Sequence, residues 1–108
     1  MKRGQIVTIA MQGDFGKTRP ALIIQADSFN ETHPSVTVLL VSSELVDAPL
    51  FRINLSPDDG NGLNKPCQIQ VDKPMTIKRE KVGAVIGRVG DAVMLQVNRA
   101  IVVWMGLA

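Results

Sequence analysis

The stretch GKTRPALIIQ, residues 16–25, passes from a polar, glycine-led segment into an apolar run that begins directly after Arg19 and Pro20. Residues 21–25 form a short, largely apolar segment between polar ones, which is typical of a buried β-strand. An arginine therefore stands where this strand begins. It is either the end of an ordinary solvated loop or a cation directed at an anionic group, and the residues alone leave both readings open.

The same short pattern recurs on both sides of this stretch and predicts a mainly β protein. Short segments rich in Val, Ile and Leu alternate with clusters of Gly, Pro, Asn and Asp. Residues 35–41 are nearly all apolar toward their end, which predicts a strand buried on both faces. Residues 50–55 alternate, which sets Arg52 and Asn54 on the outer face. Strands are predicted over residues 5–10, 21–25, 35–41, 50–55, 67–71 and 82–89, with loops that include 12–18, 27–34 and 56–66.

The C-terminal segment has a different period. Apolar residues recur at the spacing of one helix face at Val93, Val97, Ala100, Ile101 and Trp104. Asp91 follows Gly90, where it can cap the start of a helix. The alternative is a terminal strand over residues 99–104, because four of these six residues favour strands. Short strands followed by one helix predict a small antiparallel barrel with a C-terminal helix packed on it.

The composition sets the size and the partners that the fold allows. The chain has 108 residues, which predicts one domain over residues 1–108. Hydrophobic residues make up 45 %, so the core is unusually complete or some apolar surface meets a second copy in a homodimer. The net charge of +2 permits nucleic-acid binding without requiring it. With three Phe, one Trp and no Tyr, a broad stacking platform for single strands is not expected.

The cysteine count and the hydropathy pattern predict a cytoplasmic protein that does not contact a membrane. Cys67 is the single cysteine, so no internal disulfide can form, which fits a reducing compartment. The first ten residues lack the apolar centre of a signal peptide. No apolar run approaches the roughly 20 residues of a membrane-spanning helix.

Three separated stretches carry a resemblance to a known family. The first is GKTRPALII at residues 16–24, a glycine loop followed by Arg-Pro at a strand start. The second is VTVLLVSSE at residues 36–44, an apolar strand that ends in hydroxyl residues. The third is CQIQVDKPMTIKREKVGAVIGRV at residues 67–89. In this order and spacing, and with KRGQIV at residues 2–7 and VNRAI at residues 97–101, the chain resembles the MazF/PemK toxins of bacterial toxin–antitoxin pairs.

The resemblance implies a fold, an activity and two kinds of protein partner. The fold is an SH3-like antiparallel barrel with a C-terminal helix, the CcdB/PemK-type fold, assembled as a homodimer. The activity is sequence-specific cleavage of single-stranded RNA without a metal ion or other cofactor. The substrate's 2′-OH attacks the phosphate and leaves a 2′,3′-cyclic phosphate and a 5′-OH end. A cognate antitoxin protein holds such toxins inactive.

The resemblance also assigns three catalytic residues, and their chemistry suits the reaction. Arg19 is always charged and its planar fork matches two phosphate oxygens, while Pro20 restrains it to an extended geometry. Ser42 has a hydroxyl that can donate to the scissile phosphate, or bond the next turn instead. Asp72 can accept the 2′-OH proton or orient Arg19, or it can be a turn residue that caps nearby backbone N–H groups. The single histidine, His33, lies in a turn and is expected to be solvated.

Six further residues are predicted to bind RNA. Lys17 can contact a phosphate and Phe15 can stack on a base if the glycine loop closes over the substrate, although Phe15 can equally fold into the core. The predicted RNA-binding set is Phe15, Gly16, Lys17, Ser43, Gln70 and Thr76. The chain departs from some PemK-type members at Gln70 and Met75, where those members carry arginine. Such a change would weaken the enzyme or alter the sequence that it cuts.

Two other functions fit parts of the sequence. A gyrase poison of the CcdB type ends in an exposed Trp-Gly-hydrophobic tail, and this chain ends VVWMGLA, with Met105 between Trp104 and Gly106. A barrel that binds a partner without catalysis would explain Gln70, Met75 and the lack of a catalytic histidine. The Arg19-Pro20 pair and Asp72 favour the nuclease over both.

Overall fold

The computed structural model describes residues 1–11, 13 and 17–107. They form six strands, two α-helices and one 3-10 helix. In chain order these are β1 (Gln5–Ala10), β2 (Thr18–Ile23), α1 (Asp27–Asn30), β3 (Ser35–Ser42), β4 (Arg52–Leu55), β5 (Cys67–Lys78), η1 (Arg79–Lys81), β6 (Val82–Arg88) and α2 (Asp91–Met105). The predicted mainly β fold with a C-terminal helix is therefore confirmed.

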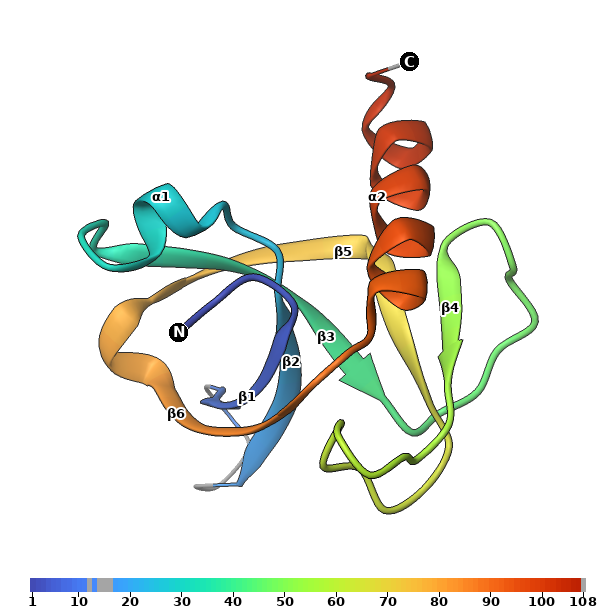
Figure 1. Cartoon of the computed structure of the whole chain (residues 1–108), viewed down its shortest axis with the longest axis horizontal. Helices are drawn as coiled ribbons and strands as arrows, with labels where there is room; N and C mark the ends of the chain where they lie inside the picture. The colour runs from blue at the N-terminus through green and yellow to red at the C-terminus, as the bar shows by residue number, and fades with distance from the viewer. Residues whose placement is uncertain (12, 14–16, 108) are drawn as a thin grey trace.

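The six strands form one sheet in the order β4-β5-β3-β2-β1-β6, and its five strand pairs are all antiparallel. The sheet curls on itself, and α2 stands beside β5 and β4 (Figure 1). The loop between β4 and β5 reaches toward the opposite edge strand, where the Arg88 N–H donates to the Gly60 carbonyl at 2.9 Å. This contact brings the two edges of the sheet together, as in a small barrel.

Two apolar clusters lie on opposite faces of the sheet because successive side chains of a strand alternate between faces. Leu39 and Val41 of β3 belong to the cluster under α2, which also holds Val97 of that helix. Val36 and Val38 of β3 belong to the second cluster, together with residues of β1 and β2. Strand β3 is therefore buried on both faces, as its apolar run predicts. Two cores in one short chain also account for much of the high apolar content.

Strand β2 differs from the prediction because it starts at Thr18 and ends at Ile23 instead of covering residues 21–25. Residues 18–20 are part of the strand because they pair with β1: Arg19 lies opposite Ile9, and Pro20 lies opposite Thr8. Arg19 is thus inside the strand and not at a loop end. In the predicted turn region 27–34, residues 27–30 form the short helix α1.

Strand β5 is the largest departure from the sequence prediction. The expected strand ended at residue 71, because Asp72 and Pro74 are typical turn residues, yet β5 continues to Lys78. Strand β3 provides partners along its whole length, with Val41 opposite Ile69 and Leu39 opposite Pro74. The register is irregular between these pairs: residues 70–73 of β5 lie opposite the single residue Leu40 of β3, so β5 has three extra residues and bends there. The reading of Asp72 as a turn residue was therefore wrong.

Strand β4 begins at Arg52, two residues later than predicted, because residues 48–52 form a turn in which the Arg52 N–H donates to the Ala48 carbonyl at 2.8 Å. Its alternation is as predicted: Ile53 and Leu55 are buried, whereas Asn54 is exposed. Strand β6 covers residues 82–88 of the predicted 82–89.

The C-terminal segment is helical, so the alternative of a terminal strand is wrong. The residue before the helix is Gly90, and Asp91 is its first helical residue without forming a side-chain cap. Gly106 ends the helix at φ +70°, a conformation that favours glycine. Trp104 packs against Phe51, with ring centroids 5.5 Å apart. Among the described residues, no helix is long and apolar enough to cross a membrane.

Candidate active site

Three neighbouring strands, in the order β5-β3-β2, carry the three residues that were predicted to be catalytic. Asp72 lies in β5, Ser42 ends β3 and Arg19 is the second residue of β2. Both β2 and β5 run antiparallel to β3, so the first part of each lies beside the last part of β3. Ser42 and Arg19 therefore lie at one end of β3 and β2, and Asp72 lies near them, in the bend of β5 opposite Leu40.

Arg19 and Ser42 lie at the same level of the sheet and on the same face. Ala21 pairs with Leu40, and continuing this register by two residues sets Arg19 level with Ser42. Residues two apart on a strand share a face, so Arg19 lies on the same face of the sheet as Ala21, and Ser42 lies on the same face as Leu40. Ala21 and Leu40 both belong to the second apolar cluster, and Arg19 is exposed at its margin. The register therefore sets a cation and a hydroxyl on one face of the sheet.

The Ser42 hydroxyl makes a local turn contact with the segment that follows β3. Its Oγ atom accepts a hydrogen bond from the Glu44 N–H at 3.1 Å, the local turn contact that sequence reasoning offered as the ordinary alternative. A serine hydroxyl can accept and donate at once. Its proton is not used by this bond, so the turn contact orients the hydroxyl and leaves its donor function for a ligand.

Asp72 has the most unusual environment of the three. Its Oδ1 atom is buried and has no hydrogen-bond partner among the residues that the structure describes. Leaving a buried polar atom unsatisfied costs about 1–3 kcal/mol, and more for a charged group. Such a cost is tolerated where a ligand supplies the missing donor. The carboxylate oxygen can accept one hydrogen bond, or a proton, from a group that enters the site.

A buried amide supports this end of the sheet, and sequence reasoning missed it. Gln68 lies opposite Ser42 in the β3–β5 register and is only 6 % exposed. Its Nε2 donates to the Val46 carbonyl at 3.0 Å and to Asn54 Oδ1 at 2.9 Å. Its Oε1 accepts from the Val46 N–H at 2.9 Å and from Arg52 Nη1 at 3.3 Å. In CQIQV, Gln68 alternates with apolar residues, and nothing in this local pattern indicates that it would be buried.

The residues predicted to bind RNA are only partly brought together. Lys17 is exposed just before β2, and Ser43 is exposed just after β3. Gln70 lies in β5 opposite Arg52 of β4. Thr76 lies opposite Thr37, five residues before Ser42, which is roughly 16 Å further along β3. Phe15 and Gly16 lie outside the described residues.

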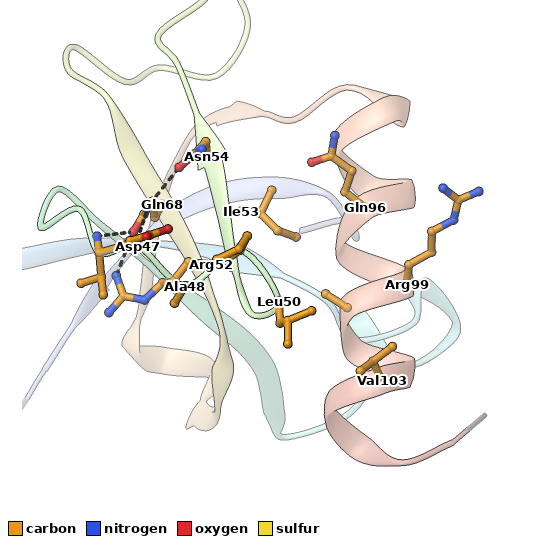
Figure 2. A pocket seen from close by; sticks show the side chains of 13 residues that line it. Asp47, Ala48, Leu50, Arg52, Ile53, Asn54, Gln68, Gln96, Arg99 and Val103 are labelled. Carbon is orange, nitrogen blue, oxygen red and sulfur yellow. Dashed lines mark hydrogen bonds between the residues drawn. The ribbon is translucent and has the colours of Figure 1, made fainter.

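A pocket of about 610 Å³ lies on the far side of β5 from β3 and was not predicted. Figure 2 shows its walls: β4 and the segment before it on one side, and Gln96, Arg99 and Val103 of α2 on the other. Arg19, Ser42 and Asp72 do not line it. In the part of the chain that the structure describes, no three His, Cys, Asp or Glu side chains gather in the way that a metal site requires.

Comparison with known proteins gives consistent matches. Residues 2–105 match the family model of the PemK-like, MazF-like toxins of type II toxin–antitoxin systems. The probable endoribonuclease MazF of Mycolicibacterium smegmatis is 39 % identical over 109 residues, which cover 100 % of this chain and 99 % of that protein. Endoribonuclease MazF9 of Mycobacterium tuberculosis is 28 % identical over 110 residues, covering 94 % and 92 %. A solved mycobacterial endoribonuclease in complex with its cognate antitoxin has a similar fold, with a TM-score of 0.84 at 21 % identity, covering 100 % of this chain and 97 % of that one.

Proposed function

The chain belongs to the PemK-like, MazF-like toxins of type II toxin–antitoxin systems, and from this membership we propose that it is a sequence-specific endoribonuclease that cleaves single-stranded RNA. The toxin role follows from the family. The nuclease activity follows from the full-length relative that is 39 % identical and named as a probable endoribonuclease. The chain acts as one domain over residues 1–108 and needs no metal ion or cofactor.

The proposed reaction uses the substrate's own 2′-OH as the nucleophile. The Asp72 carboxylate accepts the 2′-OH proton as the O2′–P bond forms and the P–O5′ bond breaks. The leaving O5′ takes a proton from a water molecule, so the products are a 2′,3′-cyclic phosphate and a 5′-OH end. Arg19 and the Ser42 O–H stabilise the charge that develops on the non-bridging phosphate oxygens.

The buried, unsatisfied Oδ1 of Asp72 is the observation that carries this assignment. It lies on the strand next to Ser42, near the end of the sheet where β2 brings Arg19. A base, a hydroxyl donor and an obligate cation on three adjacent strands are the groups that metal-free RNA cleavage requires. Lys17, Ser43, Gln70 and Thr76, together with Phe15 and Gly16, extend the RNA contacts on either side.

The proposed partners are a cognate antitoxin and a second copy of the chain, in the cytoplasm. The similar fold of a mycobacterial endoribonuclease bound to its antitoxin supports the first. The gyrase-poison alternative requires a free Trp-containing tail. Trp104 instead lies in α2 against Phe51, and the family match is to the PemK-like toxins. The silent-barrel alternative predicts no cleavage at all.

The test is RNA cleavage in the presence of EDTA by three proteins: wild type, Arg19→Ala and Arg88→Ala. Arg88 is a matched control because it is also an exposed strand arginine, but it lies in β6. We expect the wild type to cut a long mixed-sequence RNA at one short sequence and to leave 5′-OH ends. Arg19→Ala should cut about 10²–10³-fold more slowly, as for loss of one donor to a developing oxyanion, while Arg88→Ala should match the wild type.

Two results would contradict the proposal. A folded wild-type protein that leaves RNA intact would favour the silent barrel, or the gyrase poison if it inhibits DNA supercoiling. Equal cutting by all three proteins would mean that the active site does not include Arg19, or that a contaminating nuclease is responsible.

A further inference from the structure

Four polar residues form one row across four neighbouring strands of the sheet. Ser42 of β3 pairs with Gln68 of β5, and Gln68 pairs with Asn54 of β4. Continuing the β2–β3 register sets Arg19 level with Ser42. Directly opposite residues of an antiparallel pair lie on the same face of the sheet. The buried Gln68 is therefore the cross-strand neighbour of Ser42, the hydroxyl donor of the proposed reaction.

The amide of Gln68 uses all of its hydrogen-bonding capacity on protein groups. A glutamine side chain has two N–H donors and an oxygen with two lone pairs. Its Nε2 donates to the Val46 carbonyl and to Asn54 Oδ1, and its Oε1 accepts from the Val46 N–H and from Arg52 Nη1 (Figure 2). Gln68 thus holds both backbone groups of Val46, in the segment that follows Ser42.

Arg52 connects this amide to the turn that orients the Ser42 hydroxyl. Its Nη1 atom donates to the Glu44 carbonyl at 3.1 Å as well as to Gln68 Oε1. The N–H of the same Glu44 donates to Ser42 Oγ at 3.1 Å. The position of Ser42 Oγ therefore depends on Glu44, and Glu44 is held through Arg52 and Gln68.

Hydrogen bonds, and not apolar burial, hold the segment that follows Ser42. Residues 43–47 are all exposed, so their side chains contribute little packing that would fix the turn. Gln68 is only 6 % exposed, so water does not readily replace its partners. A buried polar network in which every member is satisfied makes the groups around it rigid. Gln68 is thus the buried anchor of an otherwise exposed turn.

We propose that Gln68, acting with Arg52, is a positioning residue for RNA cleavage, which fixes the turn that directs the Ser42 hydroxyl at the scissile phosphate. This inference rests on the proposed nuclease function. A donor that is oriented before the reaction stabilises developing charge without reorganising. A displacement of about 1 Å can slow a reaction by about 10²-fold. Gln68 acts through Ser42 and does not touch the reacting atoms, so it contributes to kcat and not to RNA binding.

The first test is Gln68→Met, which keeps the length of the side chain and removes its hydrogen bonds. The substrate is a synthetic RNA that contains the sequence cut by the wild type. We expect kcat to fall by about 10–100-fold and KM to change by less than about twofold. Asn30→Leu is the matched control, because Asn30 is also a buried amide but lies in α1, where it bonds Gln25 and Asp27. It should lower Tm and leave kcat unchanged.

A double-mutant cycle distinguishes positioning from a general loss of structure. If Gln68 acts through Ser42, Gln68→Met should slow cleavage by less than about twofold once Ser42 is replaced by alanine. Single-turnover rates are measured, because Ser42→Ala alone should be about 10²–10³-fold slower than the wild type. If Gln68→Met does not fold, Arg52→Met breaks the same connection to Glu44, with Arg88→Met on β6 as its control.

The outcomes separate this inference from the proposed function. If the wild type cuts RNA and a folded Gln68→Met variant cuts it equally fast, the positioning role is wrong and the nuclease stands. An equal loss of rate with and without the Ser42 hydroxyl would overturn the inference, because Gln68 would then act independently of Ser42. A raised KM with an unchanged kcat would overturn it too, by making Gln68 part of the RNA-binding surface. If the wild type leaves RNA intact, the proposed function itself fails.

Discussion

Asp72 places a carboxylate in the middle of a strand, where one of its oxygens is buried without a partner among the described residues. Asp72→Asn keeps the size of the side chain and removes the proton acceptor. We expect RNA cleavage to fall by about 10²–10⁴-fold, the usual contribution of a general base. The midpoint of thermal unfolding should not fall, since the substitution takes no hydrogen-bond partner away from the buried Oδ1 atom.

The comparison of rate and stability decides the role of Asp72. Glu80→Gln on η1 is the control, because it removes a carboxylate outside the proposed site and should change neither quantity. If Asp72→Asn loses activity and thermal stability in parallel, the carboxylate holds the fold together and does not take part in the reaction.

For single residues, the sequence predicts chemical roles better than it predicts burial. Residue type and position predicted the chemical roles of Arg19 and Ser42. The strand register sets these two residues level on one face of the sheet. The burial of Gln68 was not predicted, because a glutamine in an alternating strand looks the same whether water or a loop covers it. In this chain the loop that covers it comes from residues 43–51, and that long-range contact has no local signal.

At the scale of elements, the backbone of the loop between β4 and β5 lies very close to the backbone of β6. A Cβ atom on Gly87 would collide with the backbone carbonyl of Asn61 and lie 2.5 Å from the Gly60 oxygen. Gly87→Ala should therefore lower the free energy of unfolding by about 2 kcal/mol, measured by urea denaturation. Gly60→Ala is the control, because its Cβ would meet Asp58 Oδ1 at an ordinary 3.6 Å. Equal stability of the two variants would mean that the loop simply moves aside.

Helix α1 is fastened to the N-terminal segment by a carboxylate. The N–H of Arg3 donates to Asp27 Oδ1 at 2.6 Å, and Asn30 Nδ2 donates to it at 3.0 Å. These hydrogen bonds, the Arg3 bond first, lower the pKa of Asp27 below its usual value of 3.8. A lowered folded-state pKa adds stability that is present above the unfolded pKa and is lost as the pH falls through the folded value.

The expected result is a pH-dependent effect of Asp27→Asn on the free energy of unfolding. The variant should be less stable than the wild type at pH 7, and the gap should narrow as the pH falls below about 4. Urea denaturation at pH 7 and pH 3 measures both gaps, with Asp59→Asn in the β4–β5 loop as a surface control. A gap of constant size would assign the effect to packing and not to the charge.

The two longest strands show where element prediction from sequence succeeds and fails. The unbroken apolar run of β3 is a strong local signal, and its predicted and observed ranges differ by one residue. Strand β5 carries Asp72, Lys73 and Pro74 in its centre, which locally indicate a turn. It stays extended because β3 pairs with it on both sides of the bend, so a tertiary contact overrides local preference. The missed strand is also the one that positions Asp72.

At the scale of the whole molecule, α2 leaves an apolar surface uncovered on the single chain. Leu95 is 50 % exposed and Met105 is 55 % exposed, and they lie on a face that is distinct from the pocket-lining face of the helix. Such a surface on a small protein marks an interaction site. We expect the protein to sediment as a homodimer, at about twice the 11.7 kDa of the chain, with this face of α2 in the interface.

Leu95→Glu tests that arrangement, because it would bury a charge at the interface while leaving the monomer's core intact. We expect the variant to sediment as a monomer at concentrations where the wild type is a dimer. Leu45→Glu, in the loop after β3, removes an equally exposed leucine and should leave the dimer unchanged. A dimer that survives Leu95→Glu would place the interface on a surface other than this face of α2.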